Sequence, residues 1–284
     1  MNYWVIQLLN GLSFGMILFL LSSGLSLIFG VMRILNLAHG SFYLLGAYVS
    51  LSVAKVTGSF FLATCAGIVV VIVVGIVIER YFLRRLPHEE LPQALLTFGF
   101  LLIIADAALW IWGGTPRSLA PPEMLDFSIR IGGLVFPVYR LFLIAIGVFV
   151  GAILWYVQSA TKVGAMVRAA VDDREIAQAS GIDVSLLNTV VFGVGAGLAA
   201  LGGALSGPVL GIYPGADFEI LMLAFVVVIV GGLGSIKGAW FGGLIVGILD
   251  NFGKSLFPEL ALFTIFVPMV IILAVRPAGL FKTA

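Results

Sequence analysis

The sequence is poor in charged residues, which excludes an ordinary soluble domain. Only 10% of its 284 residues are charged, whereas 61% are hydrophobic, and the mean hydropathy is +1.19. A soluble domain carries about 25% charged and about 45–50% apolar residues. The net charge of +1 offers no basic surface for a nucleic-acid partner. The composition therefore predicts a polytopic protein of the lipid bilayer.

Residues of catalytic and metal sites are also scarce. The single cysteine, Cys65, cannot form an internal disulfide, and the two histidines, His39 and His88, form no HExxH pattern. The stretch GGLGSIKGA, residues 231–239, lacks the spacing of a phosphate-binding P-loop. We expect no enzyme activity, metal or cofactor in this chain, so any ATP would have to bind to another chain.

Apolar runs near the length of a membrane-spanning helix recur along the whole chain. About 20 such residues cross the hydrocarbon core, and the runs lie near residues 5–29, 37–54, 60–78, 94–112, 139–157, 184–206, 219–234, 239–256 and 260–275. The second and seventh are short or interrupted, so either could be a re-entrant or discontinuous helix. The sequence predicts an all-α bundle of about eight or nine spans, forming one domain over residues 1–284.

Glycines and basic residues refine this prediction. Pairs spaced by four, such as Gly193 with Gly197 and Gly238 with Gly242, favour close helix packing. Basic residues cluster in residues 79–91 and 158–183 and at the C-terminus, which predicts that these segments are cytoplasmic. The N-terminus and residues 206–218 would then lie outside.

A few polar side chains interrupt the apolar runs. In VMRILNLAHGSFYLLGAYVS, residues 31–50, Arg33 fits a short cytoplasmic link, and Asn36 can cap the helix that follows. An ionisable residue near a membrane, such as His39, is a candidate functional residue. The polar residues in or next to the spans are the candidates for lining a pathway: Asn36, His39, Ser41, Thr97, Asp106 and Asp250. Asp250 also has Lys254 one turn away.

The segment 158–183 predicts a short helix suited to docking against a soluble partner. Asp172 or Asp173 can cap it, Glu175 lies in its first turn, and Gly181 suits its end. Small and apolar residues are expected to form one narrow face: Ala170, Ile176, Ala177 and Ser180. This face would fit a groove on the partner.

Four stretches resemble one known family. RAAVDDREIAQASGIDVSLLNTVVFGVGAGLAALGGAL, GLSLIFGVMRILNLAHGSFYLLGAYVS, GGLGSIKGAWFGGLIVGIL and RPAGLF resemble the signatures of bacterial ABC permeases for branched-chain amino acids. The second stretch is more specifically similar to the H-type member of the two permease subunits. The likeness covers nearly the whole chain.

The resemblance implies an importer assembled from several chains in the bacterial inner membrane. This chain would pair with an M-type permease, two ATP-binding subunits would use the ATP, and a periplasmic binding protein would deliver the amino acid. Leucine, isoleucine and valine are the implied substrates. The coupling helix would comprise these residues of the 158–183 loop: Asp172, Asp173, Arg174, Glu175, Ile176, Ala177, Ser180 and Gly181.

Other functions remain open at this stage. A secondary transporter or channel would need internal repeats or buried coupling charges, and related permeases could carry other amino acids, amides or urea. An intramembrane enzyme would need His39 and Asp106 in one cavity, which the predicted topology does not favour. A purely structural scaffold would not need the docking loop.

Overall fold

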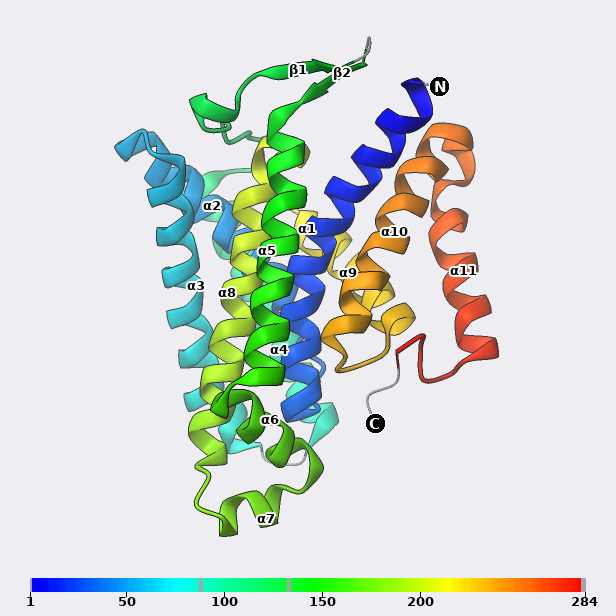
Figure 1. Ribbon diagram of the computed structural model, residues 1–284. Helices are drawn as coiled ribbons and strands as arrows, with labels where there is room; N and C mark the ends of the chain where they lie inside the picture. Colours follow the sequence, from blue (N-terminus) through cyan, green and yellow to red (C-terminus); the bar gives the residue numbers. More distant parts are fainter. Residues whose placement is uncertain (1, 87–88, 132–133, 282–284) are drawn as a thin grey trace.

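The computed structural model describes residues 2–86, 89–131 and 134–281. It is a helical bundle (Figure 1) in which the N-terminus and a small β-hairpin lie at one end and the short helices α6 and α7 at the other. The long helices are α1 (Asn2–Met32), α2 (His39–Thr57), α3 (Phe60–Tyr81), α4 (Glu90–Trp112), α5 (Val138–Ala160), α8 (Val184–Leu210), α9 (Ala216–Gly231), α10 (Ile236–Leu256) and α11 (Ala261–Val275). The all-α membrane bundle is thus confirmed.

The remaining elements connect these helices. The helices α6 (Lys162–Asp172) and α7 (Arg174–Ala179) join α5 to α8, and 3-10 turns occupy Leu83–Arg85, Glu123–Leu125 and Pro258–Leu260. The strands β1 (Ser128–Ile131) and β2 (Leu134–Pro137) pair antiparallel, with Ser128 opposite Pro137. The sequence pattern did not predict this hairpin.

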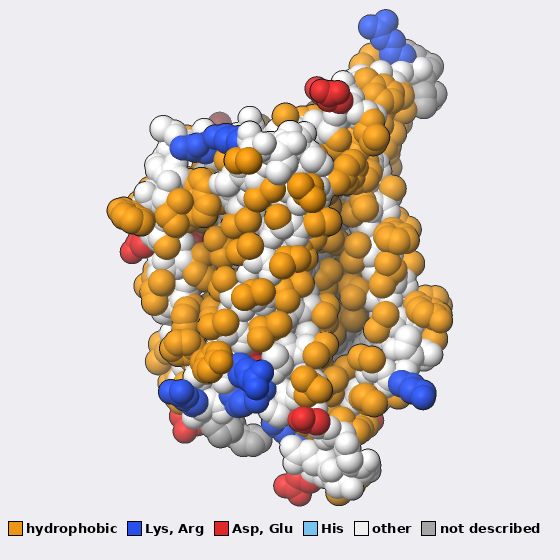
Figure 2. All heavy atoms as spheres, turned by 90° about the vertical axis from the view of Figure 1, so that its left-hand side faces the viewer, with side chains coloured by type: hydrophobic (Ala, Val, Ile, Leu, Met, Phe, Trp, Pro, Cys, Tyr) orange, Lys and Arg blue, Asp and Glu red, His pale blue; other side chains and the backbone are white. Residues whose placement is uncertain are grey.

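The bundle has a central and a peripheral set of helices. Within their apolar windows, 72% of α1 and of α8 is buried, against 22% of α4 and 17% of α5. The face shown in Figure 2 is broadly hydrophobic, with most charged side chains toward the two ends. This surface suits contact with lipid or with other apolar protein.

Glycine allows the central helices to touch backbone to backbone. A Cβ placed on Gly46 of α2 would lie 2.5 Å from Cα of Ala200 in α8, and one on Gly203 would lie 2.0 Å from the carbonyl oxygen of Tyr43. Of the predicted pairs, Gly238 and Gly242 of α10 meet backbone atoms of α9, whereas Gly193 and Gly197 of α8 meet isoleucine side chains of α3. Small residues therefore set the helix spacing here.

The predicted count of eight or nine spans is not confirmed. Among the described residues, five helices are long and apolar enough to cross a membrane: α1, α3, α4, α5 and α8. A sixth span arises if α9 and α10, which meet at 118°, count as one. Helix α2 falls outside this set, and α11 holds only a shorter apolar helix, Phe263–Val275. Helical segments nevertheless occupy all nine predicted positions.

The glycine packing predicts opposite effects at two positions. Gly46→Ala should lower the free energy of unfolding by about 1–3 kcal/mol, because the new methyl group collides with α8. Gly99→Ala in α4 is the matched control: its Cβ meets nothing within 4 Å, so the higher helix propensity of alanine should leave stability equal or slightly raised. Thermal unfolding in detergent measures both, and equal losses would contradict the packing argument.

Candidate functional site

The α6–α7 segment forms a folded unit at one end of the bundle. Oδ1 of Asp173 accepts a hydrogen bond of 2.9 Å from the backbone N–H of Ile176, which caps α7, and Glu175 lies in its first turn. Gly181 follows α7 with φ of 87°, a backbone conformation that favours glycine. The predicted short helix, its cap and its glycine stop are therefore present.

The predicted small-residue face is wrong in its orientation. Ala170 and Ala177 are only 7% and 2% exposed and pack inward with Val184 and Leu187 of α8. Ile176 is 64% exposed, and Ser180 is also exposed. The two alanines therefore hold α7 on the bundle, because small side chains allow close packing, and the face left for a partner centres on Ile176.

A polar cluster that the sequence analysis missed ties the end of α3 to α8. Glu79 is 2% exposed, and its carboxylate accepts a hydrogen bond of 2.7 Å from the hydroxyl of Thr189. The guanidinium of Arg84 lies 3.5 Å from the same carboxylate and donates to Thr189 Oγ1 and to the carbonyl oxygen of Ser185. Glu79 follows an apolar run directly, and this position could have indicated that its carboxylate is buried.

The chain re-enters the bundle in non-helical form before α2. Arg33 has φ of 56°, a strained value for a residue with a Cβ. The backbone N–H of Leu37 then donates to Oγ1 of Thr97, and that hydroxyl contacts the carbonyl oxygen of Leu35. Thr97 thus replaces the hydrogen bonds that a helix would provide, which a membrane interior requires.

Asn36 does not cap α2, contrary to the prediction. The residue before the helix is Ala38, with no side-chain cap, and the amide of Asn36 is fully buried without a partner among the described residues. Its backbone carbonyl accepts a bond of 3.3 Å from the N–H of His39. A backbone turn at Leu37 and Ala38, not a side-chain cap, therefore precedes α2.

Helix α2 begins deep inside the bundle, next to the start of α9. Nε2 of His39, which is fully buried, lies 2.9 Å from the carbonyl oxygen of Leu21. Ser41 donates to the carbonyl oxygen of Leu101, halfway along α4, and lies 3.3 Å from the Asp217 carboxylate. Asp217 is 2% exposed and was not predicted. Its burial could have been expected from the sequence, because Asp217 lies between a Pro-Gly pair and an apolar run.

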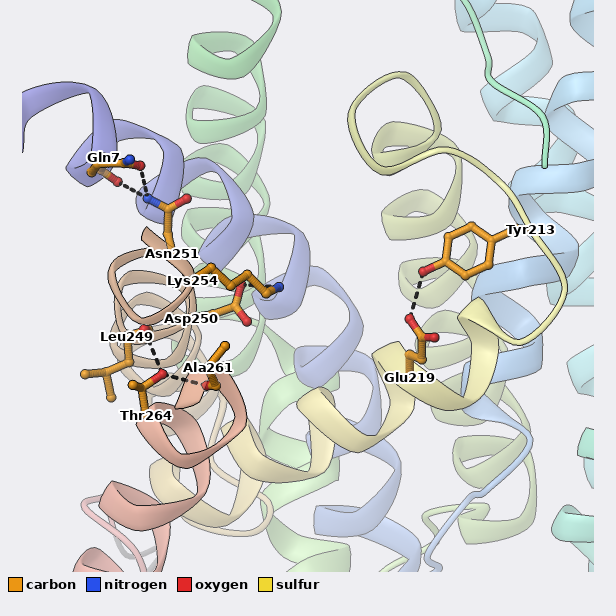
Figure 3. A network of polar contacts seen from close by, with 9 residues as sticks. All are labelled: Gln7, Tyr213, Glu219, Leu249, Asp250, Asn251, Lys254, Ala261 and Thr264. Atoms are coloured by element: carbon orange, nitrogen blue, oxygen red, sulfur yellow. Dashed lines mark hydrogen bonds and ion pairs between the residues drawn. The ribbon is translucent and has the colours of Figure 1, made fainter. Parts of the chain in front are cut away.

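The other two predicted pathway residues lie away from this region. Asp106 is exposed on α4, so within the described residues it lines no pathway with the other candidates. Asp250 is buried and lies 2.8 Å from Nζ of Lys254, as the one-turn spacing indicated. Figure 3 shows this pair on α10, near Gln7 of α1.

Hydrogen bonds around that pair fasten neighbouring helices. The amide of Asn251 donates to the backbone and side-chain oxygens of Gln7 at 2.7 Å, and Thr264 of α11 contacts the carbonyl oxygen of Leu249 (Figure 3). Across the same view, the hydroxyl of Tyr213 donates to Glu219. Asp250 thus pairs within α10, on a helix that other hydrogen bonds fasten to α1 and α11.

Two cavities separate the re-entrant segment from the α6–α7 unit. One of about 420 Å³ is lined by Arg33, Glu79, Arg84, Asp172 and Asn188, among others. The larger, of about 860 Å³, is lined by residues that include Leu35, Val167, Arg168 and Leu233. Both lie at the same end of the bundle as α6 and α7, and both include Arg33 and Asp172.

The polar cluster predicts that Arg84 has a structural role. Arg84→Ala should lower the free energy of unfolding by about 1–3 kcal/mol, because the buried Glu79 carboxylate loses its cation. The partial exposure of Arg84 limits the loss. Arg85→Ala is the control, since Arg85 is exposed and has no partner in the part of the chain that the structure describes. Chemical denaturation measures both, and equal effects would exclude the ion pair as the cause.

Comparison with known proteins identifies the family. A family model described as "Branched-chain amino acid transport system / permease component" matches residues 7–275. The permease protein BraD of Pseudomonas aeruginosa, named for high-affinity branched-chain amino acid transport, is 26% identical over 98% of this chain and 95% of its own length.

Two further relatives carry similar names. The permease protein LivH of Escherichia coli K12 is 27% identical over 98% of this chain and 95% of its own length. A probable LivH of Methanocaldococcus jannaschii is 29% identical over 83% of this chain and 76% of its own length. No solved structure matches the chain significantly. This chain therefore belongs to the family of permease components of branched-chain amino acid transport systems.

Proposed function

We propose that this chain is a permease subunit of an ABC importer that moves leucine, isoleucine and valine across the bacterial inner membrane. The near full-length likeness to permeases named for branched-chain amino acids supports the substrate class. The proposed partners are a second, M-type permease, two ATP-binding subunits and a periplasmic amino-acid-binding protein. ATP is hydrolysed on the ATP-binding subunits, and this chain carries no catalytic site.

The observation that carries the proposal is the α6–α7 unit. It presents the exposed Ile176 beyond the end of the bundle, and its buried face, including Ala177, packs against α8. A partner that pulls or pushes α7 therefore moves α8 as well, because packed helices shift as rigid bodies. This is the arrangement that a coupling helix between an ATPase and a membrane bundle needs.

The cavities supply the proposed release path for the amino acid. Their volumes lie within the range of about 300–1,000 Å³ that is typical of small-molecule pockets. The lining combines an apolar side chain, Leu35, with charges of both signs at Arg33 and Asp172. Such a lining suits passage of a zwitterion with an apolar side chain, and it lies next to the coupling unit, so both would move together.

A charge placed at Ile176, on the exposed face of α7, should uncouple ATP hydrolysis from leucine transport. In liposomes that hold the full complex and its binding protein, Ile176→Arg should reduce leucine-stimulated ATP hydrolysis at least tenfold. The side chain is 64% exposed, so the fold should persist. Ala160→Arg, exposed at the same end of the bundle, is the control and should retain stimulation.

Three outcomes would contradict parts of this proposal. Normal stimulation in Ile176→Arg would show that α7 is not the coupling helix. Equal losses in both variants would show a general effect of added charge. Wild type that responds to amides or urea, and not to leucine, isoleucine or valine, would refute the substrate class.

The cavity predicts a second effect, on uptake. Leu35→Trp should reduce leucine uptake at least fivefold, because the larger ring fills the space that the 45%-exposed leucine side chain borders. The complex should assemble in normal yield. Val73→Trp, on the exposed face of α3, serves as the control in the same radiolabelled-uptake assay. Uptake equal to the control would exclude this cavity from the pathway.

A further inference from the structure

Helix α4 leaves one face uncovered along its whole length. It packs mainly on α2, and the residues Leu95, Gly99, Ile103, Asp106 and Trp110 follow one another at spacings of four, four, three and four. Such spacings place all five on one side of a helix. Ile103 is 63% and Trp110 88% exposed. We call these five residues the outer stripe of α4.

Asp106 is out of place on a surface that faces lipid. It has no hydrogen-bond or ion-pair partner among the described residues, and it lies six residues, about 9 Å, from the end of α4 at Trp112. Tryptophans favour the membrane interface, and Trp110 stands one turn closer to that end. The carboxylate therefore lies inside the apolar layer, where an unpaired charge is costly.

The other outer helices show what a lipid-facing surface of this protein looks like. Away from their end turns, the exposed positions of α3, such as Val69 and Val73, and of α5, such as Phe149 and Ile153, are uncharged. Helix α11 contains no charged residue between Ala261 and Val275. The charge at Asp106 therefore distinguishes α4 from these three helices.

Gly99 gives an independent indication on the same stripe. Every other described glycine has either a neighbour within 4 Å of a built Cβ or a positive φ, whereas Gly99 has neither. Glycine inside a helix lowers helix stability, and no contact among the described residues requires it at this position. Glycine on an open helix face is what close approach of another membrane helix requires.

We propose that the outer stripe of α4 is the surface that binds the second permease subunit. A helix of that subunit crosses α4 at Gly99 and places a cationic or hydrogen-bond-donating side chain at Asp106. Charge complementarity favours this occupant over a second copy of the chain, because a two-fold axis at the stripe would bring two Asp106 carboxylates together. The inference rests on the proposed function, which supplies the second permease.

Photo-crosslinking in the complete complex tests which molecule covers the stripe. Benzoylphenylalanine in place of Ile103 should give a covalent adduct of this chain with the co-expressed second permease, identified by mass spectrometry. The same reagent in place of Val73, on the exposed face of α3, should give no such adduct. An Ile103 adduct between two copies of this chain, or with lipid alone, would overturn the inference.

Two substitutions test the chemistry of the contact. Gly99→Leu and Asp106→Leu should each reduce the amount of second permease that co-purifies in detergent at least tenfold. Neither should reduce the thermal stability of this chain, since Gly99 borders open space and Asp106 pairs with none of the described residues. Asp106→Asn, which keeps a hydrogen-bond acceptor, should retain more of the second permease than Asp106→Leu. Ala145→Leu, exposed on α5, is the control.

The result also separates this inference from the proposed function. If the second permease co-purifies equally with the wild type and with Gly99→Leu, while leucine still stimulates ATP hydrolysis, the inference is wrong and the proposed function stands. If wild type recruits no second permease and leucine stimulates no ATP hydrolysis, both are wrong.

Discussion

Helix backbones touch at glycine in the centre of the bundle, where Gly46 of α2 meets Ala200 of α8 and Gly15 of α1 meets Gly243 of α10. Without a hydrophobic force between helices in lipid, such close contact is what holds them together. Close contacts of the same kind reach the first turn of α2, because Gly24 of α1 lies against His39 and Gly40 lies against Asp217 of α9. They therefore fix the place at which a helix can begin inside the bundle.

That internal helix start depends on replacing lost backbone hydrogen bonds. Thr97 bonds the non-helical segment at Leu35 and Leu37, and Ser41 donates to the carbonyl oxygen of Leu101 in α4. Non-helical backbone at membrane depth persists only where protein or a water-filled space surrounds it. Here protein surrounds the start of α2, and the cavities open beside the exposed residues Arg33 and Leu35. The irregular segment thus lies between the core and the proposed release path.

The α6–α7 unit is tied to the same region from the other side. Val167 and Ala177 pack in one cluster with Leu187, and Val31 of α1 packs against that cluster. The Glu79–Arg84–Thr189 cluster adds a polar link between the end of α3 and α8. A displacement of α7 would therefore reach α1, α3 and α8 together, which joins the proposed docking surface to the cavity walls.

The sequence alone predicted those features of the fold that depend only on residues close together in the chain. The lengths of the apolar runs predicted all nine helical positions. Capping by Asp172 or Asp173 and the stop at Gly181 predicted the limits of α7, and Asp173 is the residue that caps it. The spacing of Asp250 and Lys254 likewise predicted their contact. These features follow from one helical turn or from one backbone conformation, so the residues alone suffice.

Only the tertiary structure decided which face of each helix is buried. Helix α4 is apolar all round, so its sequence could not show that Asp106 lies outside, and α7 is too short to show that Ala177 lies inside. Asp217 became visible as a neighbour of Ser41 only when α2 and α9, 176 residues apart at this contact, were placed together. Periodicity reports a helix, but its neighbours in space decide what each side chain meets.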